Sequence, residues 1–344
     1  MAFFDDLETR SSDQRSSENA ALLKDILNLA ANLDGYKAAF GSLDLSIFKS
    51  LEDLPSLPVL RKSELSEKQT RGTVLGGYSN KKSFEFAHLF QSPGPIYEPG
   101  GISHDWWRIG RFLHALDIGK GDIVHNCFSY HLTPAGMIFE NGARAVGAAV
   151  VPAGVGQTEL QVRAAVDIGS NVYTGTPDYL KIILDKADEL GESLSFNRAA
   201  VGGGALFPSL RQEYSDRGIV CRQNYATADL GNVAYESEAL DGMIVDEGVV
   251  LEIVTPGTGN PVPVGEVGEV VVTSLNADYP LIRFATGDLS ALMPGMSSCG
   301  RTNVRIKGWM GRADQTTKIK GLFVRPEQVA DLVSSHKDIQ RARI

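Results

Sequence analysis

Residues 172 to 204 read VYTGTPDYLKIILDKADELGESLSFNRAAVGGG, and the fold class follows from this stretch. It opens with a short β-rich run, after which a Thr-Pro pair is typical of an N-cap and the first residue of a helix. Apolar residues then recur at helical spacing as far as Gly191, a residue suited to end a helix. Ala199–Val201 is a second short apolar run. A strand, a helix and a second strand in this order predict a right-handed crossover within a parallel sheet.

The same alternation continues on both sides of this stretch. Short strands are predicted at Asp122–Asn126, Ala148–Val151 and Ile219–Asn224. Helices are predicted over Pro208–Arg217 and from Thr158, where a Thr and a Gln three residues apart fit a capping box. The sequence therefore predicts an α/β protein with mostly parallel sheets flanked by helices.

A β-rich subdomain is expected at about residues 243–300, because the apolar period there changes to two. Val249–Val254 and Glu269–Ser274 are predicted strands, joined in a hairpin-like way by a connection rich in Pro and Gly. A further helix is predicted over Pro326–Ser334.

The N-terminal region gives weaker signals. Residues 1–16 are polar and are expected to fray, and Ser17 resembles the N-cap of the first helix. Pro55 and Pro58 cannot lie in a helix interior, so residues 51–58 are expected to be extended.

The composition limits the class of protein. The chain has 344 residues, enough for about two domains, and its net charge of −9 disfavours binding to a nucleic-acid backbone. No apolar run reaches the roughly 18 residues of a membrane helix, and the N-terminus lacks the pattern of a secretory signal. Three scattered cysteines favour neither a disulfide framework nor a zinc site built from cysteines alone. We therefore expect a cytoplasmic protein with small-molecule partners, no nucleic acid and no membrane.

Three short segments carry groups that suit a nucleotide. Gly202, Gly203 and Gly204 follow a predicted strand, at the edge of a parallel sheet where ligands bind and a flat group can approach the backbone. Residues 224–229 combine an aromatic ring, a hydroxyl and a carboxylate. Residues 283–288 end in an aspartate, which can accept both hydroxyls of a ribose. Each segment taken alone is equally well explained by an ordinary turn.

The order of these segments resembles the phenylacetate–CoA ligase family of the adenylate-forming superfamily. The family motifs SLEDLPxLPxxxKxDL, GGQTExQ, TPSYL, YGxTE, PLIRYRTGDL and CGRTxxRxxxxxGRxDDxxKxxGxxxxPxQVE have counterparts at Ser50–Leu65, Gly156–Gln161, Thr176–Leu180, Tyr225–Asp229, Pro280–Leu289 and Cys299–Val329. The resemblance covers about residues 16–335. It implies a large N-terminal AMP-binding domain over residues 1–313. Residues 314–344 would be a hinge and the beginning of a small α+β C-terminal lid.

The resemblance also implies an activity. Enzymes of this family are acid–thiol ligases: they make an acyl-adenylate from a carboxylic acid and MgATP, release pyrophosphate, and transfer the acyl group to coenzyme A. The implied ligands are therefore ATP or AMP, Mg²⁺, coenzyme A and a small carboxylic acid, and the family resemblance suggests a homodimer. Adenylation gives the carboxylate a good leaving group, and positioning plus charge neutralisation carry the catalysis.

By the same resemblance, residues from separate motifs would hold the nucleotide. Tyr225 would stack on adenine, Thr227 would bond the α-phosphate, and Asp229 would hold Mg²⁺. Asp288 would bind the ribose hydroxyls, with Arg312 nearby. The remaining implied nucleotide-binding residues are Asn224 and the glycines that would back the adenine, Gly202, Gly203 and Gly204.

An acyl pocket and a hinge are implied as well. Four residues match the segment that lines the acyl pocket, namely Phe128, Tyr130, His131 and Met137. They favour an aromatic or other apolar acid, although plain core packing explains them equally well. Asp314 matches the hinge about which the C-terminal domain turns between the two half-reactions.

The chain departs from the family pattern at the phosphate loop. Where the family reads SSGTTGKP, residues 92–99 read SPGPIYEP, which keeps Ser92 and Gly94 but places Glu98 where lysine is usual. The prolines remove amide donors, and an anion at residue 98 is expected to weaken the binding of ATP more than that of AMP. Asp229 also replaces the usual glutamate. The sequence ends 30 residues after Asp314, so most of the lid is expected to be absent.

Two other functions remain open. The protein could pass its acyl group to a carrier protein instead of coenzyme A. It could also be a nucleotide-binding relic without catalysis, which the altered phosphate loop favours and the retained Tyr225, Asp288 and Arg312 oppose.

Overall fold

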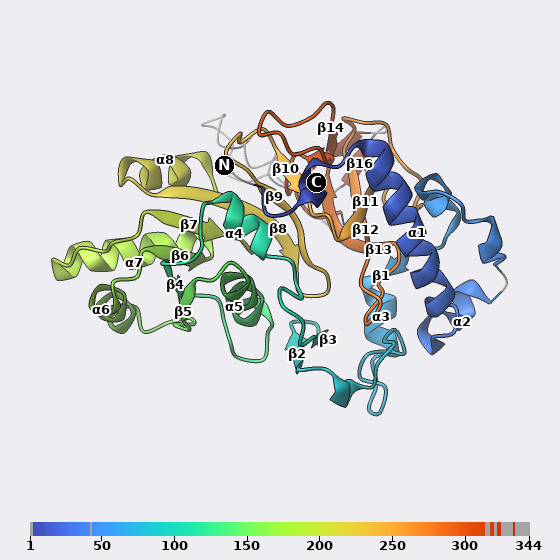
Figure 1. The fold of residues 1–344 in the computed structure, drawn as a ribbon, viewed down its shortest axis with the longest axis horizontal. Helices are drawn as coiled ribbons and strands as arrows, with labels where there is room; N and C mark the ends of the chain where they lie inside the picture. The colour runs from blue at the N-terminus through green and yellow to red at the C-terminus, as the bar shows by residue number, and fades with distance from the viewer. Residues whose placement is uncertain (1–2, 42, 314–316, 320–321, 325–332, 334–344) are drawn as a thin grey trace.

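The computed structural model describes residues 3–41, 43–313, 317–319, 322–324 and 333. Within these residues, two large sheets and the helices around them form the body of the protein (Figure 1). The larger sheet has nine strands in the order β14-β15-β10-β9-β8-β7-β6-β4-β5, and the smaller has four in the order β1-β13-β12-β11. No helix in the described ranges is long and apolar enough to cross a membrane.

One half of the larger sheet is parallel. Its parallel strands are β4 (Ile123–Asn126), β5 (Ala149–Val151), β6 (Val172–Gly175), β7 (Arg198–Val201) and β8 (Val220–Thr227). Their pairing confirms the parallel sheet predicted from the alternation of strands and helices. The other strands are β9 (Gly231–Glu236), β10 (Met243–Val245), β14 (Leu292–Met293) and β15 (Arg305–Ile306). These pair antiparallel, so the sheet is mixed.

Helices surround the parallel strands on both faces (Figure 1). They are α4 (Gly110–Ala115), α5 (Ala135–Ala145), α6 (Thr158–Ile168), α7 (Pro177–Leu190) and α8 (Pro208–Asp216). Successive residues of a strand point to opposite faces of its sheet. Val172 accordingly packs in the core cluster of α4 and α5, whereas Tyr173 packs in the cluster of α6, α7 and α8. The parallel strands are thus buried on both faces, as such strands usually are.

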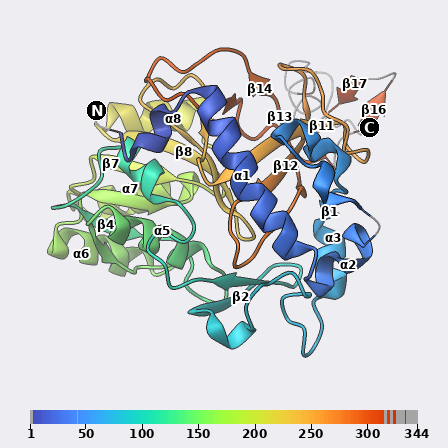
Figure 2. The ribbon, with the colours of Figure 1, turned by 45° about the vertical axis from the view of Figure 1, so that its right-hand side comes forward.

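The smaller sheet packs against the N-terminal helices. It contains β1 (Leu60–Arg61), β11 (Val249–Val254), β12 (Gly268–Ser274) and β13 (Phe284–Ser290). Strands β11 and β12 form the predicted hairpin, and β1 runs parallel to β13. Helices α1 (Ser12–Ala30), α2 (Asp34–Phe40) and α3 (Lys62–Lys68) lie beside this sheet (Figure 2). Leu23 and Ile26 of α1 share one buried cluster with Val270 and Phe284 of the sheet.

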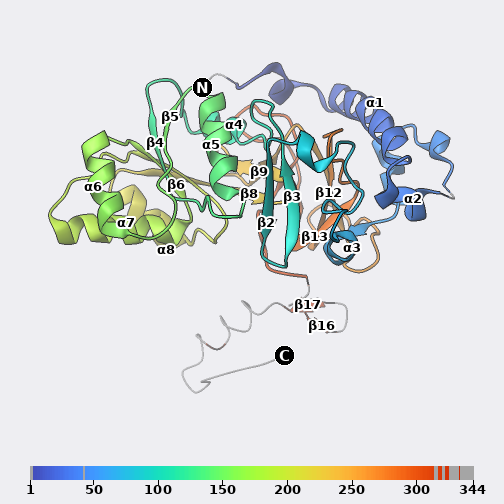
Figure 3. The ribbon, with the colours of Figure 1, turned by 90° about the horizontal axis from the view of Figure 1, so that it is seen from below.

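Two strand pairs stand apart from these sheets. Strands β2 (His88–Ser92) and β3 (Ile96–Gly100) form an antiparallel hairpin, which lies between α5 and the smaller sheet (Figure 3). Strands β16 (Thr317–Ile319) and β17 (Leu322–Val324) form a second hairpin. Short 3₁₀ helices span Asp6–Thr9, Leu45–Ile47, Leu51–Ser56 and Ser83–Glu85.

The structure corrects the predictions for the N-terminal region. Helix α1 begins at Ser12 rather than after Ser17, because Ser11 caps it by accepting a hydrogen bond from the Gln14 amide at 3.1 Å. The polar segment before α1 is fixed by buried ion pairs, among them Arg10 with Glu247 at 2.7 Å. Residues 51–56 form a 3₁₀ helix instead of an extended segment. Its proline lies next to the C-terminal end, where the loss of one N–H matters little.

The capping box predicted for α6 is also wrong, although the helix does begin at Thr158. Its N-cap residue is Gln157, which lies in the left-handed region at φ +49° and makes no side-chain cap bond. The Gln161 side chain is buried instead and donates to the carbonyls of Gly154 and Gly156.

The division into domains stays a prediction. Asp314 lies outside the described residues, as does Pro326–Ser334 apart from Val333. Within the segment 243–300, strands β11, β12 and β13 belong to the smaller sheet, whereas β10 and β14 belong to the larger one. That segment therefore contributes to both sheets.

Candidate functional site

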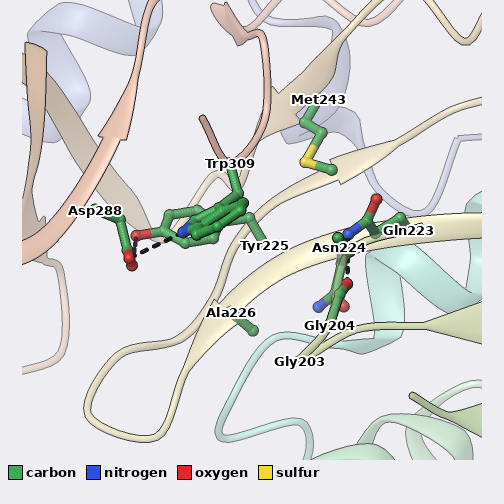
Figure 4. Close-up of a pocket in the computed structure, with 10 residues that line it drawn as sticks. Gly203, Gly204, Gln223, Asn224, Tyr225, Ala226, Met243, Asp288 and Trp309 are labelled. Carbon is green, nitrogen blue, oxygen red and sulfur yellow. Dashed lines mark hydrogen bonds between the residues drawn. The ribbon is translucent and has the colours of Figure 1, made fainter. Parts of the chain in front are cut away.

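A pocket of 360 Å³ lies at the carboxyl ends of β7 and β8, where the larger sheet approaches β13 (Figure 4). It is lined by Gly203, Gly204, Ala205, Gln223, Asn224, Tyr225, Ala226, Met243, Asp288 and Trp309. The turn after β7 supplies the first three residues, and β8 supplies the next four in succession. The carboxyl ends of parallel strands are where ligands of α/β proteins bind, and the volume suits a small molecule.

The Asp288 carboxylate is a meeting point of three hydrogen-bond donors. Its Oδ2 accepts from the Tyr225 hydroxyl at 2.9 Å. Its Oδ1 accepts from Trp309 Nε1 at 3.1 Å and from Arg312 Nη1 at 3.3 Å. Tyr225, Asp288 and Arg312, which the sequence placed in three separate motifs, therefore meet at one point of the pocket.

The glycine turn after β7 brings bare backbone to the pocket. A Cβ on Gly202 would collide with Asn224 Oδ1, and Gly203 has φ +68°, which disfavours any residue with a side chain. The Gly204 carbonyl accepts a hydrogen bond from Gln223 Nε2 at 2.9 Å, which ties the turn to β8. Gly203 and Gly204 line the pocket, so a flat group could approach their backbone closely, whereas the Asn224 side chain occupies the space at Gly202.

Tyr225 is held firmly at the edge of the pocket. It is only 8% exposed, and its hydroxyl lies 3.1 Å from Thr286 Oγ1 as well as against Asp288. Burial, and next the charge of Asp288, raise the pKa of Tyr225 well above its usual value. The hydroxyl is therefore protonated and donates to the carboxylate. Stacking of this ring on a base stays a prediction.

Thr227 has a local contact that its predicted role would have to break. Its Oγ1 accepts a hydrogen bond from the Leu230 amide at 3.1 Å and so caps the turn after β8. The threonine of the YGxTE motif moreover falls on Ala228, which has no hydroxyl. Residues 224–227 belong to β8 and pair with β9, rather than lying beyond the strand as predicted. A bond from Thr227 to an α-phosphate would require the release of this cap.

Asp229 is the centre of a buried polar group near the β2–β3 hairpin. Its side chain is fully buried, and Oδ2 pairs with Lys62 Nζ at 2.9 Å. Its Oδ1 is buried without a hydrogen-bond partner, as are Glu98 Oε2 and the Tyr279 hydroxyl. Both neighbours are close enough for the charge of Asp229 to raise their pKa values. Buried polar atoms are normally paired, so these oxygens are candidates for ligand contacts.

Glu98 is not an anion that faces a bound phosphate, contrary to the prediction. Its side chain is 1% exposed and accepts a hydrogen bond from Ser92 Oγ across the hairpin. Burial, and next the charge of Asp229, raise its pKa to about 8, so the carboxyl group is mostly protonated at neutral pH. A buried and mostly neutral carboxyl group does not favour the predicted repulsion of ATP, and the effect of Glu98 on ATP binding stays a prediction. Gly94 lies exposed at the turn of the same hairpin.

Phe128 links the predicted acyl segment to the pocket. It is buried and stacks on Phe139, with ring centroids 4.3 Å apart. A Cβ on Gly203 would lie 3.7 Å from the Phe128 ring, so the ring borders the glycine turn. This position is compatible both with core packing and with a pocket wall.

The other three residues of the acyl segment lie in different surroundings. The Tyr130 hydroxyl accepts a hydrogen bond from Asn126 Nδ2 at 2.8 Å, and burial raises the pKa of Tyr130. Met137 is half-buried against the core cluster of α5. His131 is exposed in the turn that follows Tyr130. Their role in an acyl pocket stays a prediction.

Sequence reasoning missed Trp309, which is the most exposed aromatic side chain of the pocket at 43%. It lies just before Arg312 in the counterpart of a family motif at residues 299–329, and no role was predicted for it. The available signal was a lone tryptophan flanked by Gly308 and Gly311. Four smaller contributors were missed as well, namely Ala205, Gln223, Ala226 and Met243.

Curated relatives of this chain share one name. The phenylacetate-coenzyme A ligase of Thermus thermophilus is 30% identical over 298 residues, which are 82% of this chain and 66% of the relative. The phenylacetate-coenzyme A ligase of Pseudomonas putida is 29% identical over 360 residues, 98% of this chain and 80% of the relative. A scan against models of protein families gave no match.

Solved structures agree on the fold. An open conformation of 2-hydroxyisobutyryl-CoA ligase, in complex with 2-HIB-AMP and CoA, superposes with a TM-score of 0.87 at 23% identity, over 96% of this chain and 76% of that one. An anthranilate CoA ligase in complex with anthranoyl-AMP gives a TM-score of 0.51 over 72% of this chain and 51% of that one. This α/β chain, with its mixed sheets flanked by helices, belongs to the phenylacetate–CoA ligase family of adenylate-forming enzymes.

Proposed function

We propose that this protein is an AMP-forming ligase that activates an aromatic or other apolar carboxylic acid as an acyl-adenylate and transfers the acyl group to coenzyme A in the cytoplasm. The observation that carries the proposal is the pocket in which Gly203, Tyr225 and Asp288 meet. These residues come from three separate segments of the sequence, and two of them, Tyr225 and Asp288, lie in motifs of the family. Their convergence on one small-molecule pocket is what a nucleotide site requires.

The two ends of the pocket suit the two ends of a nucleoside. The glycine backbone offers a flat surface, and Asp288 on the other side offers a carboxylate (Figure 4). A carboxylate in this position can accept both hydroxyls of a ribose. The solved 2-hydroxyisobutyryl-CoA ligase is in complex with 2-HIB-AMP and CoA, which supports an acyl-adenylate and coenzyme A as ligands here.

Mg²⁺ belongs to the same proposal, with Asp229 as its ligand. Asp229 Oδ1 is a buried carboxylate oxygen without a hydrogen-bond partner, and carboxylate oxygens are ligands that Mg²⁺ prefers. In the described part of the chain, no three His, Cys, Asp or Glu side chains gather at one point. A Mg²⁺ ion at Asp229 would therefore complete its shell with phosphate and water oxygens. When bound, the ion neutralises phosphate charge.

The remaining parts of the proposal concern the whole chain. A hinge at Asp314 would join residues 1–313, the AMP-binding domain, to a C-terminal lid. A homodimer is proposed on the family resemblance, and light scattering of the purified protein checks it.

Asp288→Ala is expected to weaken AMP binding by roughly 10- to 150-fold, because a hydrogen bond to a charged group contributes about 1.5–3 kcal/mol. Calorimetric titration of AMP measures the effect. Asp278→Ala is the matched control, since Asp278 forms an exposed ion pair with Lys81 and should leave AMP affinity unchanged. Equal AMP affinity in wild type and Asp288→Ala would reject the ribose role.

Tyr130→Ala is expected to change the preference among aromatic acids more than the Michaelis constant for ATP. Removing the half-buried ring would open space beside Asn126, whose side chain contacts the Tyr130 hydroxyl, and this space suits a larger acyl group. Steady-state kinetics with a series of substituted aryl acids measures the preference. Tyr130→Phe keeps the ring and is the control. A parallel change in both constants would make Tyr130 a structural residue only.

The second candidate function is nucleotide binding without catalysis, and the β2–β3 hairpin, which carries the altered phosphate loop, favours it. Pro93 and Pro95 remove amide donors from this loop, and Thr227 Oγ1 already accepts a hydrogen bond from the Leu230 amide. Such a protein would bind AMP without releasing pyrophosphate from ATP. A ligase that serves a carrier protein would release pyrophosphate and then acylate the purified carrier, with no release of AMP that depends on coenzyme A.

A further inference from the structure

Trp309 occupies one acceptor position of the Asp288 carboxylate, the group that a ribose would contact. Its indole N–H donates to Asp288 Oδ1 at 3.1 Å, and the side chain of Asp288 is only 13% exposed. The Tyr225 hydroxyl donates to the other oxygen at 2.9 Å. Arg312 is a third donor, at 3.3 Å from Oδ1, and a carboxylate has about four acceptor positions, so both hydroxyls of a ribose can bind only if one of the three donors leaves.

The three donors differ in how easily they can leave. Arg312 is held by a second hydrogen bond, to the Thr286 carbonyl at 3.2 Å. Tyr225 is buried in the core, and its hydroxyl lies between Asp288 and Thr286. Trp309, by contrast, has 43% of its surface exposed to solvent. Its ring can turn outward without the loss of core packing.

The backbone on both sides of Trp309 is fixed, so a movement would be confined to its side chain. The Gly308 carbonyl accepts a hydrogen bond from Ser290 Oγ at 2.7 Å. The Met310 amide donates to the Leu289 carbonyl at 2.9 Å, and the Leu289 amide donates to the Gly311 carbonyl at 2.8 Å. Residues 308 and 310–311 are thereby tied to the end of β13, and rotation about the side-chain bonds of Trp309 is what remains.

We propose that Trp309 is a selectivity residue of the nucleotide site: its indole N–H donates to Asp288 Oδ1 and is exchanged for a ribose hydroxyl when a nucleotide binds. This inference rests on the proposed function of the pocket. A ribonucleotide replaces the lost N–H contact with its own hydroxyl. A nucleotide without ribose hydroxyls cannot make this exchange. A ligand that offers no donor to Asp288 therefore does not displace the Trp309 indole.

The exchange predicts that Trp309→Phe, which keeps an aromatic ring but has no N–H group, changes the affinity for one ligand and not for another. AMP should bind about 3- to 10-fold more tightly to this variant, because one hydrogen bond no longer has to be broken. The affinity for 2′,3′-dideoxy-AMP should stay the same, because it does not displace the indole. Calorimetric titration of both nucleotides against both proteins measures the ratio.

Tryptophan fluorescence gives a second readout that does not depend on affinity. The chain has three tryptophans, and Trp106 and Trp107 do not line this pocket. AMP should change the emission of wild type and of Trp106→Phe, but not that of Trp309→Phe. Saturating 2′,3′-dideoxy-AMP should leave the emission of wild type unchanged.

The outcomes separate this inference from the proposed function. If AMP binds wild type and Trp309→Phe equally, or binds the variant more weakly, the exchange is wrong while the nucleotide site stands. An unchanged emission of wild type at saturating AMP would also overturn the exchange. If neither protein binds AMP, the pocket is not a nucleotide site, and both proposals fail.

Discussion

Glu8→Ala should lower the free energy of unfolding by about 3–5 kcal/mol, the loss expected when one partner of a buried ion pair is removed. Glu8 and Arg301 are each 1% exposed. Arg301 Nε donates to Glu8 Oε1 at 2.9 Å, and the Tyr235 hydroxyl donates to the same oxygen at 2.7 Å. Without Glu8, the Arg301 cation would lose its shorter ion pair and keep the longer one, with Glu238 at 3.3 Å.

Urea unfolding followed by circular dichroism measures this loss. The matched control is Glu18→Ala, since Glu18 pairs with Arg10 but has an exposed side chain, and its loss should be at most about 1 kcal/mol. If the two variants lost the same small amount, the N-terminal segment would not be fixed by the Glu8–Arg301 pair.

Glu98→Gln should be more stable than wild type above pH 8, with a difference that shrinks as the pH falls toward 5. The pKa of Glu98 is raised to about 8 in the folded protein from its usual 4.5, so the folded state holds a proton that the unfolded state has lost. Between these values, wild type loses about 1.4 kcal/mol of stability per pH unit through this group. Below pH 4.5 both states are protonated, and above pH 8 the loss is complete. Glutamine is neutral at every pH, so Glu98→Gln does not lose this stability.

Urea unfolding of both proteins at pH 5, 6.5 and 8.5 gives the difference at each pH. Because glutamine has nearly the same shape and can still accept from Ser92, the comparison isolates ionisation. Other titrating groups act on both proteins alike. A difference that does not depend on pH would mean that Glu98 is ionised inside the folded protein.

Local signals in the sequence were sufficient for the parallel half of the fold. The Thr-Pro pair and Gly191 predicted both ends of α7, and short apolar runs predicted β4 to β7 within one or two residues. These features depend on neighbours in the chain, such as caps, turns and apolar spacing. The convergence of Tyr225 and Asp288 was accessible only through the order of the family motifs, because residues 63 positions apart in sequence have no local signal of contact.

The features that the sequence could not predict depend on burial by distant residues. Glu8 lies in a polar segment, and nothing near it shows that Arg301 will bury it. Glu98 was expected to act as an anion. In the structure the hairpin buries it, Ser92 donates to it, and the nearby charge of Asp229 helps to raise its pKa. Trp309 gave no local signal of a site because its partner, Asp288, lies in β13, 21 residues earlier in the sequence.

The central claim is that this pocket makes an acyl-adenylate, and release of pyrophosphate from ATP tests it most directly. The assay uses the full-length protein with Mg²⁺ and a panel of aromatic and aliphatic acids, with Asp288→Ala as the matched control. The account predicts that at least one apolar acid stimulates release in wild type, and that Asp288→Ala lowers this release at limiting ATP. Binding of AMP without stimulated release by any acid of the panel would contradict the claim and favour a protein that binds nucleotides without catalysis.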